Sequence, residues 1–126
     1  MLSQGVVIQN NQLLMVKQRV KRGDTVWNFP GGGVEKDETF EEACIREVRE
    51  ETGYAERIIE LLYTNDSKHT YLCEVVSGEL TIEDDEDILD VQWVGLFDDH
   101  YFDDVSKPIV ELVRKLTMQE RGKRYV

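Results

Sequence analysis

The sequence predicts an α/β fold in which a mixed β-sheet is sandwiched between helices, an α/β/α arrangement. Short apolar or alternating segments, typical of strands, are interrupted by one helical segment at 39–53 and closed by a second at about 107–119. The chain has 126 residues, the size of one ordinary domain. We therefore expect a single domain over residues 1–126, without repeats or linkers.

The N-terminal part is predicted to form a hairpin followed by an extended segment. Apolar runs at Gly5 to Gln9 and Leu13 to Gln18 flank Asn10-Asn11, a pair that favours a tight turn. A third extended run, Thr25 to Phe29, leads into Pro30-Gly31-Gly32-Gly33. Because glycine tolerates positive φ and lets the backbone approach a ligand, this segment is a candidate binding loop.

The first predicted helix carries its own start and stop signals. Thr39 and Glu42 form a capping-box pattern, and Gly53 can turn left-handed just past the helix end. Apolar residues recur every four positions, at Phe40, Cys44 and Val48, and so form one apolar face of the helix. This face is expected to be buried against the sheet.

The C-terminal half is predicted to consist of strands and one closing helix. Four strands are expected, at Ile58 to Tyr63, Thr70 to Val76, Leu80 to Ile82 and Val91 to Val94. The helix from about Lys107 to Gln119 has Pro108 in its first turn, where proline is tolerated. Its apolar face comprises Ile109, Leu112, Val113 and Leu116.

Three carboxylates gather on the first helix. Glu47, Glu50 and Glu51 fall within an arc of roughly 100°, next to the apolar stripe, where like charges repel one another. Few cations of the sequence are placed to pair with them. A hard divalent cation, Mg²⁺ or Mn²⁺, fits this donor set and also binds phosphates. The alternative is an acidic face exposed to solvent.

The segment from Gly32 to Tyr54 resembles the signature of the Nudix hydrolase family. The seven fixed positions of that signature are all filled, by Gly32, Glu38, Arg46, Glu47, Glu50, Glu51 and Gly53. Two positions depart from the usual pattern: Asp37 replaces a frequent glycine and Tyr54 replaces an aliphatic residue. Neither is a ligand. The resemblance implies the Nudix fold, which is an α/β/α sandwich.

The resemblance also implies roles for the residues of the signature. Glu47, Glu50 and Glu51, with the backbone carbonyl of Gly31, would hold one or more Mg²⁺ ions. Arg46 would orient these carboxylates, and Glu38 would brace the glycine loop or an outer metal ion. Water, activated by a carboxylate or on the metal, would attack phosphorus. Which carboxylate is the general base, and how many ions bind, stay open.

Further ligands are expected outside the signature. The acidic run at 83–87 is expected to supply an extra carboxylate, Glu86 or, less favoured, Glu83. The basic run that begins with Lys17-Gln18-Arg19 is predicted to place Lys17 and Arg19 on substrate phosphates, alongside the backbone of Gly32 and Gly33. The alternatives are solvated loops in both cases.

The implied reaction splits a nucleoside diphosphate linked to a moiety X into a nucleoside monophosphate and phosphoryl-X. The short chain favours a MutT-like nucleoside triphosphate pyrophosphatase. ADP-ribose, nucleotide sugars, dinucleoside polyphosphates and RNA 5′ ends stay open as substrates. A different class, a sensor that binds a nucleotide without cleaving it, is disfavoured because all three carboxylates of the helix are present. Trp27 and Tyr63 are candidates to stack on a base, although a core position is favoured for Trp27.

Composition restricts the partners and the compartment. The net charge is −11, so the field of the protein disfavours nonspecific nucleic-acid binding. There is no signal-like N-terminus and no apolar run near 18 residues, so we expect no membrane partner and a cytoplasmic location. Cys44 and Cys73 lack metal or redox spacing and are expected to be buried reduced thiols. The sequence does not decide the oligomeric state.

Overall fold

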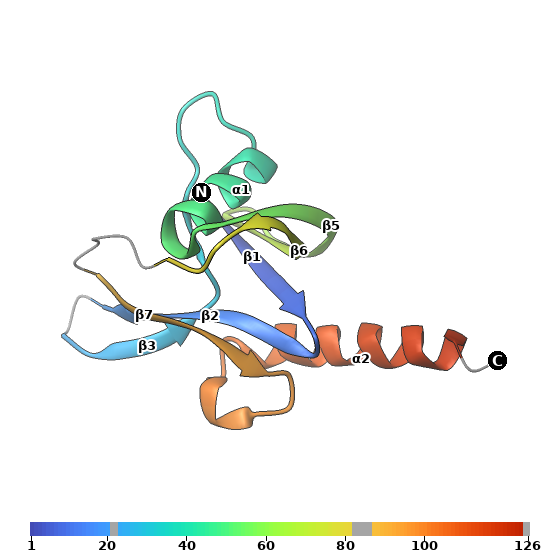
Figure 1. Cartoon of the computed structure of the whole chain (residues 1–126). Coiled ribbons are helices and arrows are strands. Elements are labelled where there is room, and N and C mark those ends of the chain that lie inside the picture. The colour runs from blue at the N-terminus through green and yellow to red at the C-terminus, as the bar shows by residue number, and fades with distance from the viewer. Residues whose placement is uncertain (21–22, 82–86, 125–126) are drawn as a thin grey trace.

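The computed structural model describes residues 1–20, 23–81 and 87–124, and side chains as far as residue 119. Within these residues the chain forms seven strands, two α-helices and one turn of 3₁₀-helix (Figure 1). The strands are β1 (Leu2–Gln9), β2 (Gln12–Arg19), β3 (Thr25–Asn28), β4 (Gly31–Gly33), β5 (Tyr54–Thr64), β6 (Lys68–Gly78) and β7 (Ile88–Gly95). The helices are α1 (Phe40–Thr52) and α2 (Lys107–Arg124), with the 3₁₀ turn at Asp99–Tyr101.

The strands form one mixed sheet with β1 at its centre. The order along the sheet is β3-β2-β1-β6-β5, with β4 also paired to β1 and β7 to β2. β1 runs parallel to β6 and antiparallel to β2 and β4. The β1–β2 turn places Asn10 and Asn11 at φ of 52° and 60°, as the predicted hairpin requires.

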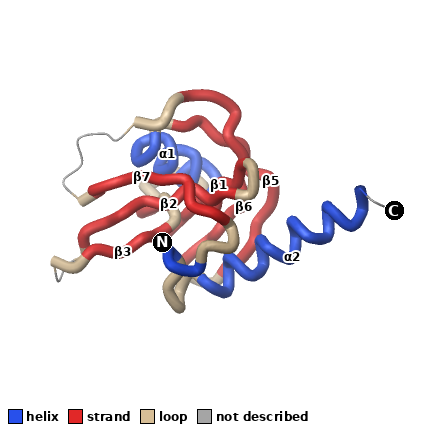
Figure 2. The backbone as a smooth tube through the Cα atoms, turned by 60° about the horizontal axis from the view of Figure 1, so that its bottom comes forward, coloured by secondary structure: helices blue, strands red, loops and turns tan. Residues whose placement is uncertain are grey.

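Two cores lie on opposite faces of this sheet, because neighbouring residues of β1 and β2 point in opposite directions. Val7 and Leu14 pack in the core under α1, which Cys44 and Val48 of the helix complete. Val6 of β1 and Leu13 and Met15 of β2 point to the opposite face and pack under α2. That second core comprises Val6, Leu13, Met15, Phe29, Leu72, Val94, Leu96, Phe102, Val110 and Val113. The predicted α/β/α sandwich is therefore confirmed. The last turns of α2 extend beyond the sheet (Figure 2).

Helix α1 begins and ends where the sequence predicts. The Thr39 hydroxyl accepts from the Glu42 N–H at 3.0 Å, and the Glu42 carboxylate accepts from the Thr39 N–H at 3.1 Å. Gly53 follows the helix with φ of 85°, and its N–H donates to the Arg49 carbonyl. The caps fix the register of the helix, and thereby the direction of every glutamate on it.

The glycine segment differs from the prediction. Gly31–Gly33 is the short strand β4, paired with Leu2, Ser3 and Gln4 of β1, and none of its three residues has a positive φ. The expectation that these glycines serve a left-handed loop is therefore wrong. Their missing side chains serve close packing instead: a Cβ on Gly31 would lie 2.5 Å from the Ser3 carbonyl oxygen.

The strand predicted at Leu80 to Ile82 is also wrong for its described residues. Leu80 and Thr81 have no strand structure, and Ile82 lies outside the described part of the chain. The Thr81 N–H donates to the Thr52 carbonyl at 2.9 Å, so this segment packs against the end of α1 rather than against a strand.

Neither of the helices in the described part of the chain has the length and apolar character that a membrane span requires.

Candidate active site

The carboxylates of α1 lie against the glycine strand β4. The Gly31 N–H donates to the Glu51 carboxylate at 3.1 Å. A Cβ built on Gly32 would lie 2.6 Å from the Glu47 carboxylate carbon, so only glycine leaves room for that side chain. Residues separated by about 20 positions in the sequence are thus brought together, as the prediction required.

Arg46 connects the acidic side chains on this surface. Its guanidinium donates twice to Glu38, at 2.8 Å and 3.0 Å, and once to the Gly33 carbonyl at 2.8 Å. It also reaches Glu47 at 2.8 Å and Glu50 at 3.3 Å. The sequence indicated few cations for this cluster and assigned Arg46 to orient its carboxylates; in the structure this one arginine contacts three glutamates of the signature. Planar guanidinium groups suit this bidentate and bridging geometry.

The surroundings shift the pKa values of these groups in different directions. The hydrogen bond from Arg46, followed by that from the Glu35 N–H, lowers the pKa of Glu38 to about 2. Burial raises the pKa of Glu47, although Arg46 opposes the change. Glu38 is therefore a fixed anion, whereas Glu47 is a carboxylate whose charge is incompletely compensated by the protein.

The donor set fits a hard divalent cation. Glu47, Glu50 and Glu51 offer only oxygen atoms, which is the ligand type that Mg²⁺ and Mn²⁺ prefer. In this arrangement Glu47 and Glu50 point to Arg46 and Glu51 points to Gly31. All three residues are described, yet their ligand atoms do not gather within 4.8 Å of one another.

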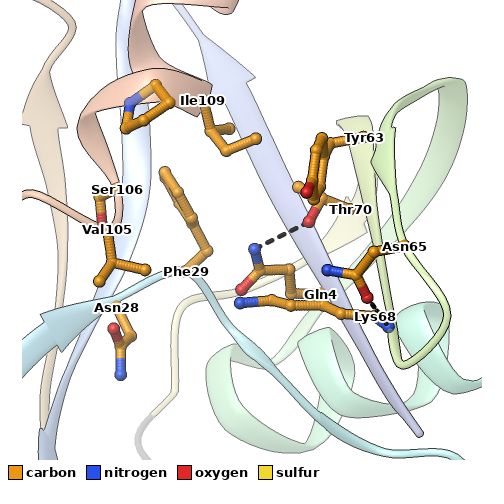
Figure 3. Close-up of a pocket in the computed structure, with 11 residues that line it drawn as sticks. Gln4, Asn28, Phe29, Tyr63, Asn65, Lys68, Thr70, Val105, Ser106 and Ile109 are labelled. Carbon is orange, nitrogen blue, oxygen red and sulfur yellow. Dashed lines mark hydrogen bonds between the residues drawn. The ribbon is translucent and has the colours of Figure 1, made fainter.

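A cavity of about 350 Å³ lies between β1, the end of β3 and the start of α2 (Figure 3). It is lined by Gln4, Asn28, Phe29, Tyr63, Asn65, Lys68, Thr70, Val105, Ser106, Pro108 and Ile109. A smaller cavity of about 240 Å³ shares Gln4, Asn28, Phe29 and Lys68 with it and reaches Gly31 and Gly32. The two cavities are therefore neighbours; the smaller reaches the glycine strand, and the larger is lined by Tyr63, which is half exposed.

The polar groups that line the two cavities come from several strands. Gln4 of β1 donates to the Thr70 hydroxyl at 2.9 Å, and Asn28 donates to Gln18 at 3.2 Å. Lys68 supplies an amine at the start of β6, as Figure 3 shows. Amides, a cation and aromatic rings therefore surround these cavities, and the smaller one reaches Gly31 and Gly32, the glycines against which Glu51 and Glu47 lie.

Comparison with known proteins places this arrangement in a family. The family model described as NUDIX domain matches residues 1–112. The chain belongs to the Nudix family. Proteins of this family generally use divalent metal ions, in agreement with the donor set of α1.

Individual relatives agree with this assignment. The chain is 32% identical over 91 residues to an ADP-ribose pyrophosphatase of Methanocaldococcus jannaschii, a match that covers 64% of this chain and 54% of that protein. It is 42% identical over 67 residues to an RNA pyrophosphohydrolase of Histophilus somni, covering 52% of this chain and 32% of that protein. The chain thus spans about half or less of the length of these curated relatives.

A solved structure supports the same fold. A NUDIX hydrolase from Nitrosomonas europaea superposes with a TM-score of 0.78 at 22% identity, covering 90% of this chain and 87% of the other. This likeness concerns the fold of the two chains.

Some predicted Nudix site residues lie apart from the cavities. Lys17 pairs with Trp27 across β2 and β3, and Arg19 pairs with Thr25. Of this run, Gln18 lines the smaller cavity, whereas Lys17 and Arg19 line neither of the two cavities described above. Their contact with phosphate stays a prediction. Glu83 and Glu86, like Lys21 and Arg22, lie outside the described residues.

The sequence interpretation missed Gln4, Asn28 and Lys68. Asn28 had a usable signal, since it stands just before the Phe29-Pro30-glycine segment. Lys68 had none, because the parallel pairing of β1 with β6 brings it opposite Leu2, 66 positions away in the sequence.

The aromatic residues divide between packing and the cavity. Trp27 packs edge-on against Tyr101, with ring centroids 5.2 Å apart, and borders the core under α2. The Trp93 N–H donates to the Tyr54 hydroxyl at 3.2 Å. The packing position favoured for Trp27 is therefore confirmed, whereas Tyr63 lines the cavity together with Phe29.

Proposed function

We propose that this protein is a Mg²⁺-dependent pyrophosphohydrolase, with Mn²⁺ as a substitute, that cleaves nucleoside triphosphates to nucleoside monophosphate and pyrophosphate. The observation that carries the proposal is the junction between α1 and β4. There, the Glu51 carboxylate accepts from the Gly31 N–H, the Glu47 carboxylate lies against Gly32, and the smaller cavity, of about 240 Å³, reaches both glycines.

Each residue of the junction has a proposed part. Glu47, Glu50 and Glu51, with the Gly31 carbonyl, would hold the divalent ion, which supplies charge neutralisation and water activation when bound. A carboxylate of this set accepts the proton of the attacking water. Water oxygen bonds to phosphorus, and the bond to the bridging oxygen breaks with pyrophosphate leaving. Arg46 and Glu38 act as positioning residues through the hydrogen bonds that they make.

The cavity suits a nucleoside. Its volume of about 350 Å³ lies at the lower end of the range of about 300–1,000 Å³ typical of small-molecule sites. The amides of Gln4, Asn28 and Asn65 can donate to and accept from base edges, and Tyr63 offers a face for stacking. Lys68, between this space and Gly31, is placed to bind a phosphate. A cavity of this size accommodates one nucleoside more readily than two.

The relatives define the competing substrates. One is named an ADP-ribose pyrophosphatase and another an RNA pyrophosphohydrolase. ADP-ribose and 5′-triphosphorylated RNA are therefore the second candidates, because both contain the diphosphate linkage that the proposed site would cleave.

A substrate screen tests the proposal. The purified protein is incubated with Mg²⁺ and each of the nucleoside triphosphates, ADP-ribose, a dinucleoside polyphosphate and a 5′-triphosphorylated RNA, and the products are separated by ion-exchange chromatography. We expect monophosphate and pyrophosphate in equal amounts from a nucleoside triphosphate. Nucleotide binding by calorimetry without turnover of any substrate would establish a sensor and reject the enzyme.

A further inference from the structure

A second group of potential ligands lies under α1, apart from Glu47, Glu50 and Glu51. Cys44 of α1, Glu56 of β5 and Cys73 of β6 have ligand atoms that all lie within 4.8 Å of one another, and all three residues are buried. The two sulfur atoms are 3.9 Å apart and both cysteines are free. Three consecutive elements, α1, β5 and β6, thus place two thiols and a carboxylate at one point.

Among the residues that the structure describes, Glu56 has no hydrogen-bond partner. The residue is 6% exposed, and both of its carboxylate oxygens are buried without a hydrogen-bond partner. An isolated buried carboxylate is destabilising unless it is protonated, paired or bound to a metal. Its orphaned oxygens therefore point to a ligand rather than to a packing role, which an apolar side chain would fill better.

The spacing of the sulfur atoms matches that of two ligands on one metal ion. Zn–S bonds of about 2.3 Å at a tetrahedral angle place two sulfurs about 3.8 Å apart, close to the 3.9 Å between Cys44 and Cys73. A Cβ on Gly5 would lie 3.1 Å from one sulfur and 3.3 Å from the other, and 2.9 Å from Val48. Glycine at that position therefore lets the sulfur pair lie close against β1.

We propose that Cys44, Cys73 and Glu56 bind a thiophilic divalent ion of the zinc class, which ties helix α1 to strands β5 and β6. Thiolate ligands select Zn²⁺ over Mg²⁺, so this ion differs from the one proposed at Glu47, Glu50 and Glu51. Binding displaces a proton from each thiol and from the Glu56 carboxyl, since only the deprotonated forms are ligands. A water molecule fills the fourth position. The site stands whether or not the proposed hydrolysis is correct.

Cobalt is the probe that separates the two sites. The full chain is reduced and freed of metal with a chelator, and Co²⁺ is added both to the folded protein and during refolding from urea. We expect one equivalent per chain to give an intense thiolate-to-cobalt charge-transfer band, which Zn²⁺ abolishes by displacement. A carboxylate site gives no such band. Absence of the band under both conditions overturns the proposal.

Variants assign the band to its ligands. Cys44→Ala and Cys73→Ala are each expected to abolish it, and Glu56→Gln to weaken cobalt affinity at least tenfold. Glu50→Gln is the matched control, because it removes a carboxylate of the same helix that belongs to the proposed Mg²⁺ site and not to the thiol site. It should leave the band unchanged. Circular dichroism verifies that each variant is folded. If Glu50→Gln removes the band, or if Glu56→Gln binds cobalt as the wild type does, the assignment is wrong.

Discussion

Gly32 is required for space and not for its backbone angle. Its φ is that of a strand residue, whereas an added Cβ would lie 2.6–2.8 Å from three atoms of the Glu47 carboxyl group. The sequence indicated the correct residue for a different reason, because spacing reveals that a glycine is needed but not which neighbour excludes a side chain. That neighbour belongs to the tertiary structure.

The first prediction is that Gly32→Ala lowers turnover by about 10²-fold, because a ligand displaced by about 1 Å is sufficient for such a loss. Steady-state hydrolysis of the best substrate measures it. Gly95→Ala is the control, since a Cβ there meets only an ordinary contact of 3.7 Å with Asp98. Equal turnover of the two variants would show that Glu47 has no geometric role.

Glu56 leads to a prediction about pH. Burial raises its pKa to about 8 from 4.5, so between these values the folded protein holds a proton that the unfolded chain has released. The free energy of unfolding of the metal-free protein should then fall as pH rises from 5 to 8, by up to a few kcal/mol. Urea titrations at intervals across this range measure the slope. Glu56→Gln should flatten it, and an identical slope in the variant would contradict the assignment.

At the scale of elements, the sequence predicted those parts whose signals are local. The caps of α1 depend on residues three or four positions apart, and they are found as predicted. β5 was predicted only from Ile58, although it begins at Tyr54. Its pairing with β6 shifts register between Ala55 and Glu56 and at two further places, so the alternation that identifies a strand is interrupted.

The candidate site shows the same division. The contact between α1 and β4 was predictable because the resemblance to the Nudix signature implies that the glycine segment and the glutamates of the helix share a ligand. The cavity was not, because Gln4 and Lys68 meet only through the parallel pairing of β1 and β6. Such long-range pairing leaves no pattern in one sequence.

Gly53 carries the prediction for the end of α1. It has φ of 85°, and a Cβ there would lie 2.3 Å from the Glu79 carbonyl oxygen and from the Thr81 hydroxyl. Gly53→Ala should therefore lower the free energy of unfolding by about 2 kcal/mol or more, since the left-handed conformation alone costs about 1–2 kcal/mol. Urea denaturation measures the change. A loss equal to that of Gly95→Ala would show that the turn relaxes freely.

At the scale of the whole molecule, net charge and function are in apparent conflict. A charge of −11 repels polyphosphates at long range. Lys68 and the proposed divalent ion at α1 would reverse the sign of the potential locally, so that phosphates would be attracted to one place on an otherwise repelling surface. The same acidity disfavours nonspecific contact with nucleic acids.

Divalent metal should consequently stabilise the fold. Arg46 compensates Glu47 and Glu50 only in part, so an ion that binds the native cluster raises the melting temperature. Millimolar Mg²⁺ is expected to raise it by about 2–6 °C, as read by differential scanning calorimetry. Glu50→Gln should reduce the rise. A melting temperature that does not change with Mg²⁺ concentration would count against a metal site at α1.

The most direct test of the account is Mg²⁺-dependent turnover of a nucleoside triphosphate by the wild type, Glu50→Gln and Glu42→Gln. Glu41 is unsuitable as a control because it accepts from the Tyr71 hydroxyl at 2.7 Å. Glutamine at position 42 preserves the capping box, which tolerates either residue. We predict that Glu50→Gln loses on the order of 10³-fold in turnover, while Glu42→Gln stays within a few-fold of the wild type. Equal activity of the two variants would contradict the account.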